Sequence, residues 1–392
     1  MNKKIYIQYN CIAHYRARIF ELLTNNSEYD FTVVADNEAD TPFMATVNDL
    51  GDRKIRHIVA KTYQIKLPGL PIFYFQPNAI NMTLKDKPDL VIALGSPYSI
   101  TAWLLLLICK LLRIPVLLWG HGLLGGETGL KWWVRKVFYK LASGQLLYGN
   151  YAKKLLIDKG FPASTLHVVY NSLDYDNQVS IYKNITQQMK EEFRESLEIN
   201  NNDRLIIFTG RLQPVKRLDM IIDAIGILHG KGITVHVAFI GEGQERSKLA
   251  DLAKRNDITD QVHFLGASYD ENYLGLALSS SDLCVIPSGA GLSIMHSMVF
   301  GTPVLIHDEY KFHFPEWEAV VDKKTGLYYK YGSIDDLAQK MEEALYPQPL
   351  KQSIEQNCLK MIDRQYNPHI QEKIFVESIS HYLKDQSPSR KI

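Results

Sequence analysis

A pair of cations follows an apolar, strand-like run in the second half of the sequence. The run Leu205–Phe208 leads through Thr209 and Gly210 to Arg211, and Lys216 follows in the same loop. The glycine lets the backbone turn at the end of the strand, so that both basic side chains extend from one place. A guanidinium and an ammonium over one crevice would stabilise the charge of a diphosphate leaving group. The alternative is an ordinary basic loop at the start of a solvated helix.

A loop of small residues follows a later strand-like run and precedes a helical segment. Its members are Ser288, Gly289, Ala290, Gly291, Leu292 and Ser293. Small side chains let a ligand approach the free N–H groups at the start of a helix, where a phosphate binds favourably. His296 stands eight residues after Ser288 and flanks the same turn. The loop therefore predicts a phosphate-binding turn, and the alternative for His296 is a core position with an ordinary hydrogen bond.

Two further strand-to-helix turns contain glycine. His121 lies between two glycines after the apolar run Leu117–Trp119, a setting that exposes its imidazole and favours a functional role over a structural one. Gly241 follows another strand-like run in a Gly-x-Gly turn, which is a weak signal and equally typical of a tight turn. Arg246 occupies the position where a dinucleotide fingerprint has its third glycine, so the pattern disfavours a nicotinamide enzyme.

The elements that must position these loops alternate along almost the whole chain. Apolar runs typical of buried parallel strands lie at Ile5–Tyr9, Phe31–Ala35, Leu90–Leu94, Val116–Trp119 and Leu146–Tyr148, and again at Leu205–Phe208, Val235–Ile240, Val262–Leu265, Leu283–Ile286 and Val304–Ile306. Helical periodicity separates them at Tyr15–Leu23, Ser99–Leu112, Trp132–Ala142, Leu218–Leu228, Glu245–Lys254 and Tyr273–Leu278. This alternation predicts an α/β protein with doubly wound parallel sheets.

The alternation is interrupted once, which divides the chain into two α/β domains. The polar segment Asn171–Asn202 lacks the strand and helix rhythm and predicts a linker. We therefore expect one Rossmann-like domain over residues 1–175, a second over 176–365, and a C-terminal helix within 366–392 that packs back on the first domain. Two facing domains of this type bind a ligand between the carboxyl ends of their sheets.

Composition bounds the setting in which such a protein works. The 392 residues, 46% hydrophobic and 22% charged, are typical of a globular protein with two domains. The net charge of +1 gives no indication of a nucleic-acid partner. The four cysteines are scattered, which predicts reduced thiols in a cytoplasmic protein and neither disulfides nor a zinc site. The apolar stretch Ala102–Trp119 contains Lys110, Arg113 and Pro115, so we do not expect it to span a membrane.

The ordered set of loop motifs resembles the retaining glycosyltransferases of family 4, which have the two-domain GT-B fold. The resemblance covers nearly the whole chain and is strongest from Arg204 to Gly326. It is carried by Phe208-Thr-Gly-Arg-Leu with Lys216, Phe239-Ile-Gly-Glu-Gly, His263-Phe-Leu-Gly, Pro287-Ser, Gly301-Thr-Pro-Val and the interdomain Asn171-Ser-Leu-Asp. It implies transfer of a sugar from a nucleoside-diphosphate sugar, with UDP as the expected nucleotide, with retained anomeric configuration and without a cofactor or obligatory metal. It also implies a setting in surface polysaccharide or lipopolysaccharide synthesis.

The resemblance assigns a role to each loop. It implies that Arg211 and Lys216 hold the donor diphosphate and that His121 lies beside the donor sugar. Donor binding is expected from Gly210, Gly241, Ser288, Gly289, Ala290, Gly291, Leu292, Ser293 and His296. The first domain would bind the acceptor through the loop that contains Asn10, His14, Arg16 and Arg18.

The sequence departs from the family at two positions. Most members carry two glutamates eight residues apart, where this chain has Ser288 and His296. A subset with an Ile-Met-His-Ser helix and a later Pro-Glu is more similar, and here the later piece contains Glu316 and Glu318. Our hypothesis is that Glu316 supplies a polar donor contact that the replaced glutamates no longer make. The alternative is that both acids are solvated residues at a helix start.

A basic and aromatic segment in the first half suits a membrane surface as partner. Lys131–Lys140 contains two tryptophans and four Lys or Arg residues. On a helix, one apolar stripe would pack on the sheet, formed by Leu130, Val134, Val137 and Leu141, and Trp133, Lys136 and Lys140 would share a neighbouring face. Cations beside an interfacial tryptophan suit an anionic membrane surface and a lipid-linked acceptor. The alternative is a solvated basic face on a core helix.

Two other functions remain open at the level of sequence. A nucleotide-sugar epimerase of similar fold would convert its donor without an acceptor. A non-catalytic binding subunit would explain the missing glutamates, but it would have no need of Arg211, Lys216 and His121 together.

Overall fold

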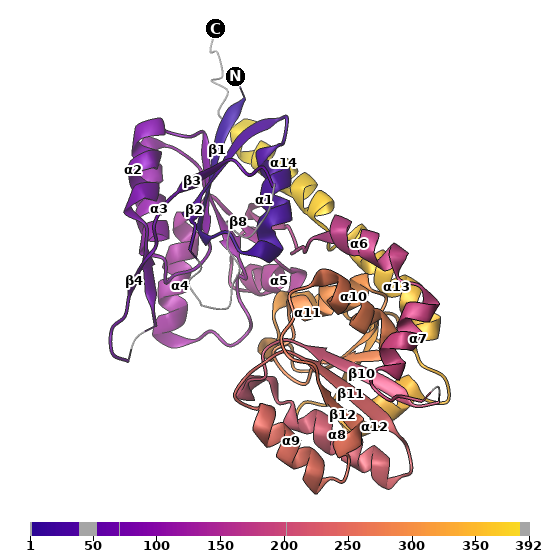
Figure 1. Cartoon of the computed structure of the whole chain (residues 1–392). Helices are drawn as coiled ribbons and strands as arrows, with labels where there is room; N and C mark the ends of the chain where they lie inside the picture. The colour runs from indigo at the N-terminus through magenta and orange to yellow at the C-terminus, as the bar shows by residue number, and fades with distance from the viewer. Residues whose placement is uncertain (1, 39–52, 70, 201, 385–392) are drawn as a thin grey trace. The chain divides into compact units, whose positions relative to one another are not determined.

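The computed structural model describes residues 2–38, 53–69, 71–200 and 202–384 (Figure 1). The chain forms two compact units. The first contains the residues up to Asp174 together with those from Asn367 onward, and the second contains Tyr175–Tyr366. Each unit is an α/β unit built around one parallel sheet.

The sheet of the first unit has seven parallel strands in the order β3-β2-β1-β6-β7-β8-β9. The strands are β1 (Lys3–Cys11), β2 (Tyr29–Asp36), β3 (His57–Val59), β6 (Leu90–Leu94), β7 (Val116–Gly120), β8 (Gly144–Leu147) and β9 (Leu166–Val168). A short antiparallel pair, β4 (Tyr63–Ile65) and β5 (Phe73–Phe75), stands outside this sheet. The central strands are buried over nearly their whole length, which explains their continuous apolar runs.

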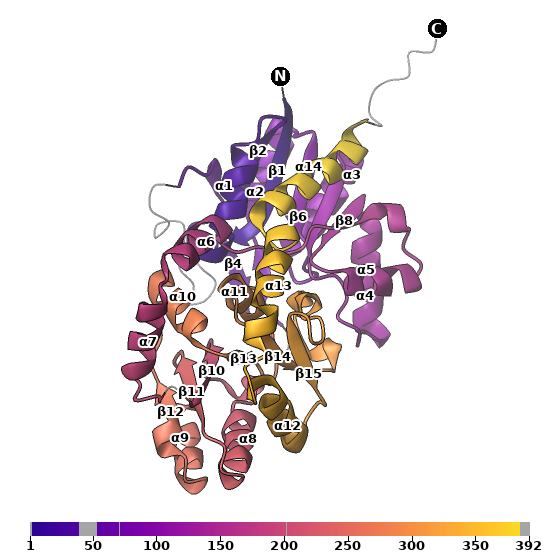
Figure 2. The ribbon, with the colours of Figure 1, turned by 90° about the vertical axis from the view of Figure 1, so that its right-hand side faces the viewer.

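Helices cover both faces of this sheet. One core contains side chains of α1 (Ala17–Thr24) and α14 (Pro368–Lys384), including Phe20 and Phe375. The other contains side chains of α2 (Pro77–Asp86), α3 (Ile100–Leu112), α4 (Gly129–Leu141) and α5 (Asn150–Asp158). The chain therefore returns at its end to the first unit, where α14 lies beside α1 (Figures 1 and 2).

The sheet of the second unit has six parallel strands in the order β12-β11-β10-β13-β14-β15. The strands are β10 (Arg204–Thr209), β11 (Val235–Ile240), β12 (Val262–Phe264), β13 (Leu283–Val285), β14 (Val304–His307) and β15 (Gly326–Tyr329). Helix α8 (Asp219–Gly230) packs between α9 (Arg246–Arg255) and α12 (Ile334–Leu345). The other helices of this unit include α10 (Glu271–Ser280), α11 (Leu292–Val299) and α13 (Lys351–Arg364), and α11 packs against α13. The two parallel sheets confirm the predicted fold class.

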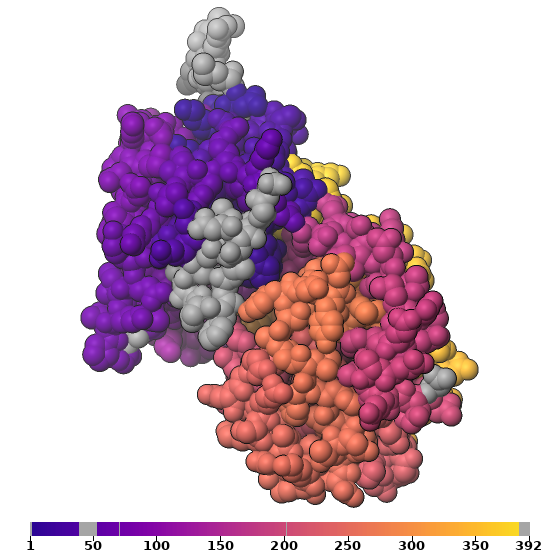
Figure 3. Space-filling model, in the orientation of Figure 1, coloured from indigo at the N-terminus to yellow at the C-terminus, as the bar shows by residue number. Residues whose placement is uncertain are grey.

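The predicted linker is wrong. Residues 171–202 contain two helices, α6 (Tyr175–Asn184) and α7 (Gln187–Glu195), which pack against α10. Only a few of their side chains are buried, among them Ile181 and Phe193. Most of their exposed residues are polar. Both helices form part of the surface of the second unit (Figure 3). Because so few apolar residues mark these helices, their sequence has the composition of a linker.

The predicted apolar stripe of α4 is also wrong in part. Leu130 is 75% exposed, whereas Phe138 and Tyr139 are buried. The ring of Phe138 lies 4.9 Å from that of Trp103 on α3. Burial on α4 therefore follows its contact with α3, which the periodicity of a single helix does not reveal.

Among the residues that the structure describes, none of the helices combines the length and the apolar character needed to span a bilayer.

Candidate functional site

At the carboxyl edge of the second sheet, the turn that follows β10 and the turn that follows β11 each contain a glycine, and the two turns are in close contact. Gly210 follows β10 with φ +140°, and its N–H donates to the carbonyl oxygen of Ile240 at 3.0 Å. A Cβ on Gly241 would lie 1.9 Å from the carbonyl oxygen of Gly210. No side chain fits there without moving the backbone, so glycine at 241 is required for the two loops to approach.

Lys216 joins the β10 loop to the loop that precedes α11. Its ammonium donates to the carbonyl oxygen of Gly289 at 2.6 Å. Burial lowers the pKa of Lys216, and the charge of Arg211 lowers it further. Arg211 itself is exposed. The structure thus brings the two predicted cations together beside the small-residue loop, with one of them anchored to that loop.

Contacts with other segments hold the small-residue loop in place. The hydroxyl of Tyr329 donates to the carbonyl oxygen of Pro287 at 2.8 Å. Gly289 has φ +62°, a conformation that favours glycine. Gly291 precedes α11 as its N-cap residue and provides no side-chain cap. The start of α11 is therefore the part of the loop whose N–H groups lack a capping side chain.

Ala290, which was expected to bind the donor, has no free backbone N–H group. Ala290 is fully buried, and its N–H donates to Nδ1 of His313 at 3.2 Å. Its carbonyl oxygen accepts from the N–H of Phe314 at 2.8 Å. Both backbone groups are used inside the protein, so Ala290 offers no donor to a ligand. Leu292 and Ser293 in the first turn of α11 are half-buried.

The two positions that replace the family's glutamates lie on different parts of the turn. Ser288 is half-buried in the loop, and His296 is half-buried on α11. Nε2 of His296 lies 2.8 Å from Oε1 of Glu271, and the same oxygen accepts from the amide of Gln178 at 2.8 Å. A carboxylate thus stands beside position 296, supplied by the first residue of α10. Sequence reasoning missed Glu271, because an acid at a helix start has the ordinary appearance of a dipole partner.

Glu316 does not lie in solvent, so the alternative that it is a solvated acid is wrong. The residue belongs to the 3₁₀ turn Pro315–Ala319, which packs against α11, and it is 2% exposed. Its neighbour Glu318 is half-buried. His313, which precedes this turn by two residues, is a second residue that sequence reasoning missed. The only sequence signal for it was its position just before Phe314-Pro315-Glu316.

In the first unit, His121 follows β7 at the carboxyl edge of the sheet. Its side chain is exposed, and its ring centroid lies 4.9 Å from that of Tyr148. Surrounding protein atoms lower the pKa of His121, and the charges of Arg16 and Arg135 lower it further. The imidazole is therefore neutral near pH 7, with one donor and one acceptor nitrogen.

Arg16, which was expected to bind the acceptor, is buried. It is 5% exposed, and its guanidinium carbon lies 5.1–5.5 Å from the ring centroids of Tyr9, Tyr15, Trp119 and Tyr148. Among the residues that the structure describes, its Nε and Nη1 have no hydrogen-bond acceptor. Cation–π attraction to the four rings offsets part of the free-energy cost of these two missing hydrogen bonds. Arg16 therefore belongs to the core of the first unit.

The other predicted acceptor residues lie around the end of β1. Asn10 is half-buried, and its carbonyl oxygen accepts from the Thr62 hydroxyl at 2.9 Å. His14 is exposed. Arg18 is half-buried and forms an ion pair with Glu21 at 2.9 Å. Of the three, His14 has the most accessible side chain.

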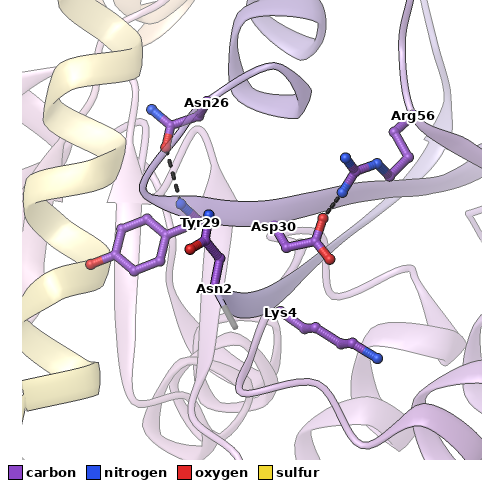
Figure 4. A pocket seen from close by; sticks show the side chains of 6 residues that line it. All are labelled: Asn2, Lys4, Asn26, Tyr29, Asp30 and Arg56. Atoms are coloured by element: carbon purple, nitrogen blue, oxygen red, sulfur yellow. Dashed lines mark hydrogen bonds and ion pairs between the residues drawn. The ribbon is translucent and has the colours of Figure 1, made fainter.

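A separate hollow lies at the opposite edge of the first sheet (Figure 4). It is lined by Asn2, Lys4, Asn26, Tyr29, Asp30 and Arg56. Lys4, Tyr29 and Asp30 belong to the starts of β1 and β2, whereas His121 follows the end of β7. Since the strands are parallel, this hollow is remote from the loops at the carboxyl edge. Arg56 and Asp30 form an ion pair there, which neutralises both charges.

Comparison with known families identifies both halves of the chain. The model described as Glycosyltransferase Family 4 matches residues 23–177, and the model described as Glycosyl transferases group 1 matches residues 189–361. Protein CapJ of Staphylococcus aureus is 24% identical over 232 residues, which is 58% of this chain and 57% of CapJ. A D-inositol 3-phosphate glycosyltransferase of Gordonia bronchialis is 30% identical over 168 residues, 40% of this chain and 36% of that enzyme. The chain thus spans about half, or less, of these relatives.

Solved structures share the fold over nearly the whole chain. HepE of Anabaena in complex with UDP has a TM-score of 0.74 at 18% identity and covers 97% of this chain and 100% of its own. The lipopolysaccharide outer core galactosyltransferase WaaB has a TM-score of 0.69 at 15% identity, with 96% of this chain and 99% of its own covered. At such identities the likeness shows the fold alone.

Proposed function

Because the chain belongs to the family 4 glycosyltransferases, we propose that it transfers a sugar from a UDP-linked donor to a glycan or lipid-linked glycan acceptor. Members of this family generally retain the anomeric configuration of the donor. Retention without a metal and a setting in surface polysaccharide or lipopolysaccharide synthesis are part of the proposal. Support for the nucleotide comes from HepE, which was solved with UDP and with UDP-glucose. Support for the setting comes from the likeness to WaaB.

The observation that carries the proposal is that Arg211 and Lys216 lie beside the loop that precedes α11. Lys216 is fixed by the carbonyl of Gly289, so its ammonium is in place before a ligand arrives. An ammonium has three donors, and two remain for the oxygens of a diphosphate. Arg211 adds a guanidinium from the same loop. The two cations, of which Lys216 is held in place, would stabilise the charge that develops on the leaving diphosphate as the bond from the sugar to the phosphate breaks.

The start of α11 completes the anion site. Gly291 has no side chain, and a helix N-terminus without a capping side chain offers N–H groups and a positive dipole end to a phosphate. Leu292 and Ser293 supply the next two N–H groups. We assign these groups, together with Lys216, to the diphosphate, and Ser288 and Gly289 to the wall of the same site.

We assign His121 to the donor sugar, as the resemblance to the family implies. A neutral imidazole both donates and accepts, which suits a sugar hydroxyl better than a second cation does. The proton of the attacking acceptor hydroxyl would pass to an oxygen of the departing phosphate on the same face of the sugar. This route needs no protein carboxylate as a base, in line with the replacement of both family glutamates by Ser288 and His296. His14 and Arg18, with Asn10, would contact the acceptor.

Glu316 and the pair His296–Glu271 are the candidates for the contacts that the missing glutamates make elsewhere. Glu316 is buried in the turn that packs on α11, and Glu271 fixes the imidazole of His296. Replacing Glu316 with Gln keeps the shape and removes the charge. Unchanged donor affinity and turnover in that variant would exclude a donor contact by Glu316.

A lipid-linked acceptor would be reached at an anionic membrane surface through Lys131–Lys140. Trp133 is 62% exposed, and Lys131 and Lys140 are exposed on the same helix. An exposed tryptophan beside lysines favours the interface of an anionic bilayer. Flotation with vesicles that contain anionic lipid tests this surface, with vesicles of zwitterionic lipid as the control. Absence of binding to either would remove the membrane from the proposal.

The transfer reaction itself is tested by product analysis. The protein is incubated with UDP-sugars and a panel of glycan and lipid-linked acceptors, and the release of UDP and the anomeric configuration of the product are measured by NMR. Acceptor-dependent release with a retained configuration supports the proposal. Conversion of the donor without any acceptor would instead indicate an epimerase.

A further inference from the structure

Two segments that are far apart in the sequence are joined at Ala290. Its N–H donates to Nδ1 of His313 at 3.2 Å, and its carbonyl oxygen accepts from the N–H of Phe314 at 2.8 Å. Ala290 is fully buried and His313 is 3% exposed. Loss of a hydrogen bond at a buried site destabilises the folded protein, because the group left without a partner has no water to bind. The backbone at Ala290 is therefore fixed by residues 313 and 314.

Both nitrogens of the His313 ring are used, and their roles can be assigned. Nε2 lies 3.0 Å from the carbonyl oxygen of His307, which can only accept, so Nε2 carries the hydrogen. Nδ1 is then the acceptor that the Ala290 N–H requires. The ring also stacks on that of His307, with centroids 3.9 Å apart. Burial lowers the pKa of His313 to about 3, with His307 and Lys216 adding to the effect, so the ring is neutral in this arrangement.

The bond at Ala290 decides how the chain enters α11. Gly291 follows with φ −155° and ψ −128°, and a Cβ on it would lie 3.1 Å from the ring of Phe314. The preceding Gly289 is held by Lys216. With the peptide of Ala290 turned inward on His313, the next N–H groups belong to the uncapped first turn of α11. The direction in which the N–H groups of this turn point thus depends on the ring of His313.

We propose that His313 is a positioning residue of the donor site, which holds Ala290 so that the N–H groups at the start of α11 face the phosphates of the nucleotide. This inference rests on the proposed function, because it needs a phosphate ligand at α11. His313 would act only through the loop and would not touch the nucleotide. Its loss would weaken nucleotide binding by loosening the N–H groups that the ligand needs in a fixed direction.

The two amide replacements of histidine separate the two hydrogen bonds of the ring. In His313→Asn the side-chain oxygen takes the place of Nδ1 and can still accept from Ala290. In His313→Gln the amide reaches the place of Nε2, so it can donate to His307 but no longer accepts from Ala290. His229→Gln is the control, since His229 is exposed on α8 and is remote from the loop in sequence.

Two measurements are made on the full chain and on each variant. Calorimetric titration with UDP, GDP and dTDP gives the dissociation constant of whichever nucleotide the unchanged protein binds. Hydrogen exchange of the peptide that contains Ala290 reports whether the loop is held. We expect His313→Gln to bind about tenfold more weakly, which is the loss of one hydrogen bond of ordinary strength, and to exchange faster at Ala290. His313→Asn should keep both properties close to those of the unchanged protein, as should the control.

The outcomes distinguish this inference from the proposed function. Equal affinity of His313→Gln and the unchanged protein would overturn the positioning role. Equal weakening in both amide variants would also overturn it, because the ring would then matter only for packing. If the unchanged protein binds no nucleotide, the proposed function fails and the donor role of His313 with it. Slow exchange at Ala290 that is lost only in His313→Gln would still establish that the ring holds the loop.

Discussion

The ammonium of Lys216 lies 2.6 Å from the carbonyl oxygen of Gly289, so a cation of one strand-end loop is bound to the backbone of the next. The two loops follow β10 and β13, which are neighbours in the sheet. This bond places a positive charge beside the start of α11 in the free protein. The positive charge and the loop conformation that a diphosphate needs would therefore be present before the ligand binds.

Replacing Lys216 with Met should weaken nucleotide binding by about tenfold or more, because a charge-assisted hydrogen bond to phosphate is lost. The loop should also become less ordered, since Gly289 loses its partner. Calorimetric titration measures the affinity. Lys254→Met is the matched control, because Lys254 is 68% exposed on α9. Equal affinity of both variants and the unchanged protein would show that Lys216 has no part in binding.

Gly241→Ala should destabilise the second unit and reduce nucleotide binding. The added Cβ would lie 1.9 Å from the carbonyl oxygen of Gly210, so the two turns must separate. We expect the free energy of unfolding to fall by about 2–4 kcal/mol, as for other changes that force backbone apart. Gly230→Ala is the control, because a Cβ there meets no atom within 4 Å. Denaturant unfolding of both variants compares the two glycines, and similar unfolding midpoints would contradict the close approach.

Lys351→Met should destabilise the protein by about 2–4 kcal/mol, because it leaves buried acceptors without a partner. The Lys351 ammonium donates to the carbonyl oxygens of Ser279 and Ser281 at 2.7 and 2.8 Å and to the hydroxyl of Thr302 at 3.1 Å. It thereby ties the start of α13 to the end of α10. Thermal unfolding of Lys351→Met is compared with that of Lys360→Met, an exposed lysine on the same helix. A loss of stability in the second variant as large as in the first would refute this role.

Acid should destabilise the folded protein before its carboxylates are protonated. Burial lowers the pKa of His263 and His307 to about 4 and that of His313 to about 3, from an ordinary value of 6.5. Between these values the unfolded chain binds protons that the folded chain does not, so the stability rises with pH across this window and is lost as the pH falls. We expect the melting temperature to drop by several degrees between pH 7 and pH 5. An unchanged melting temperature would mean that these rings titrate normally.

The central strands were predictable, because a strand buried on both faces needs a continuous apolar run, as at Leu90–Leu94. The strands β3, β9 and β15 at the sheet edges, and the short pair β4 and β5, were not predicted. The helices α6 and α7 were not, since Ile181 and Phe193 are among the few apolar side chains they bury. The cations Arg211 and Lys216 could be found because they follow directly from a strand end. The bonds from His313 to Ala290 and from His296 to Glu271 could not be found, because they join residues more than twenty positions apart on different elements. Arg16 was misjudged because its aromatic partners come from three different strands and turns.

The most direct test of the central claim is a thermal-shift panel of UDP, GDP, dTDP and their sugar conjugates, with and without magnesium. A ligand at 100 times its dissociation constant adds about 2.7 kcal/mol to the stability of the folded state, which is readily measured. We predict a clear rise in melting temperature with UDP and a UDP-sugar, of equal size with and without the metal. Well-folded protein whose melting temperature rises with none of these nucleotides would contradict the account and would indicate a subunit that binds no donor.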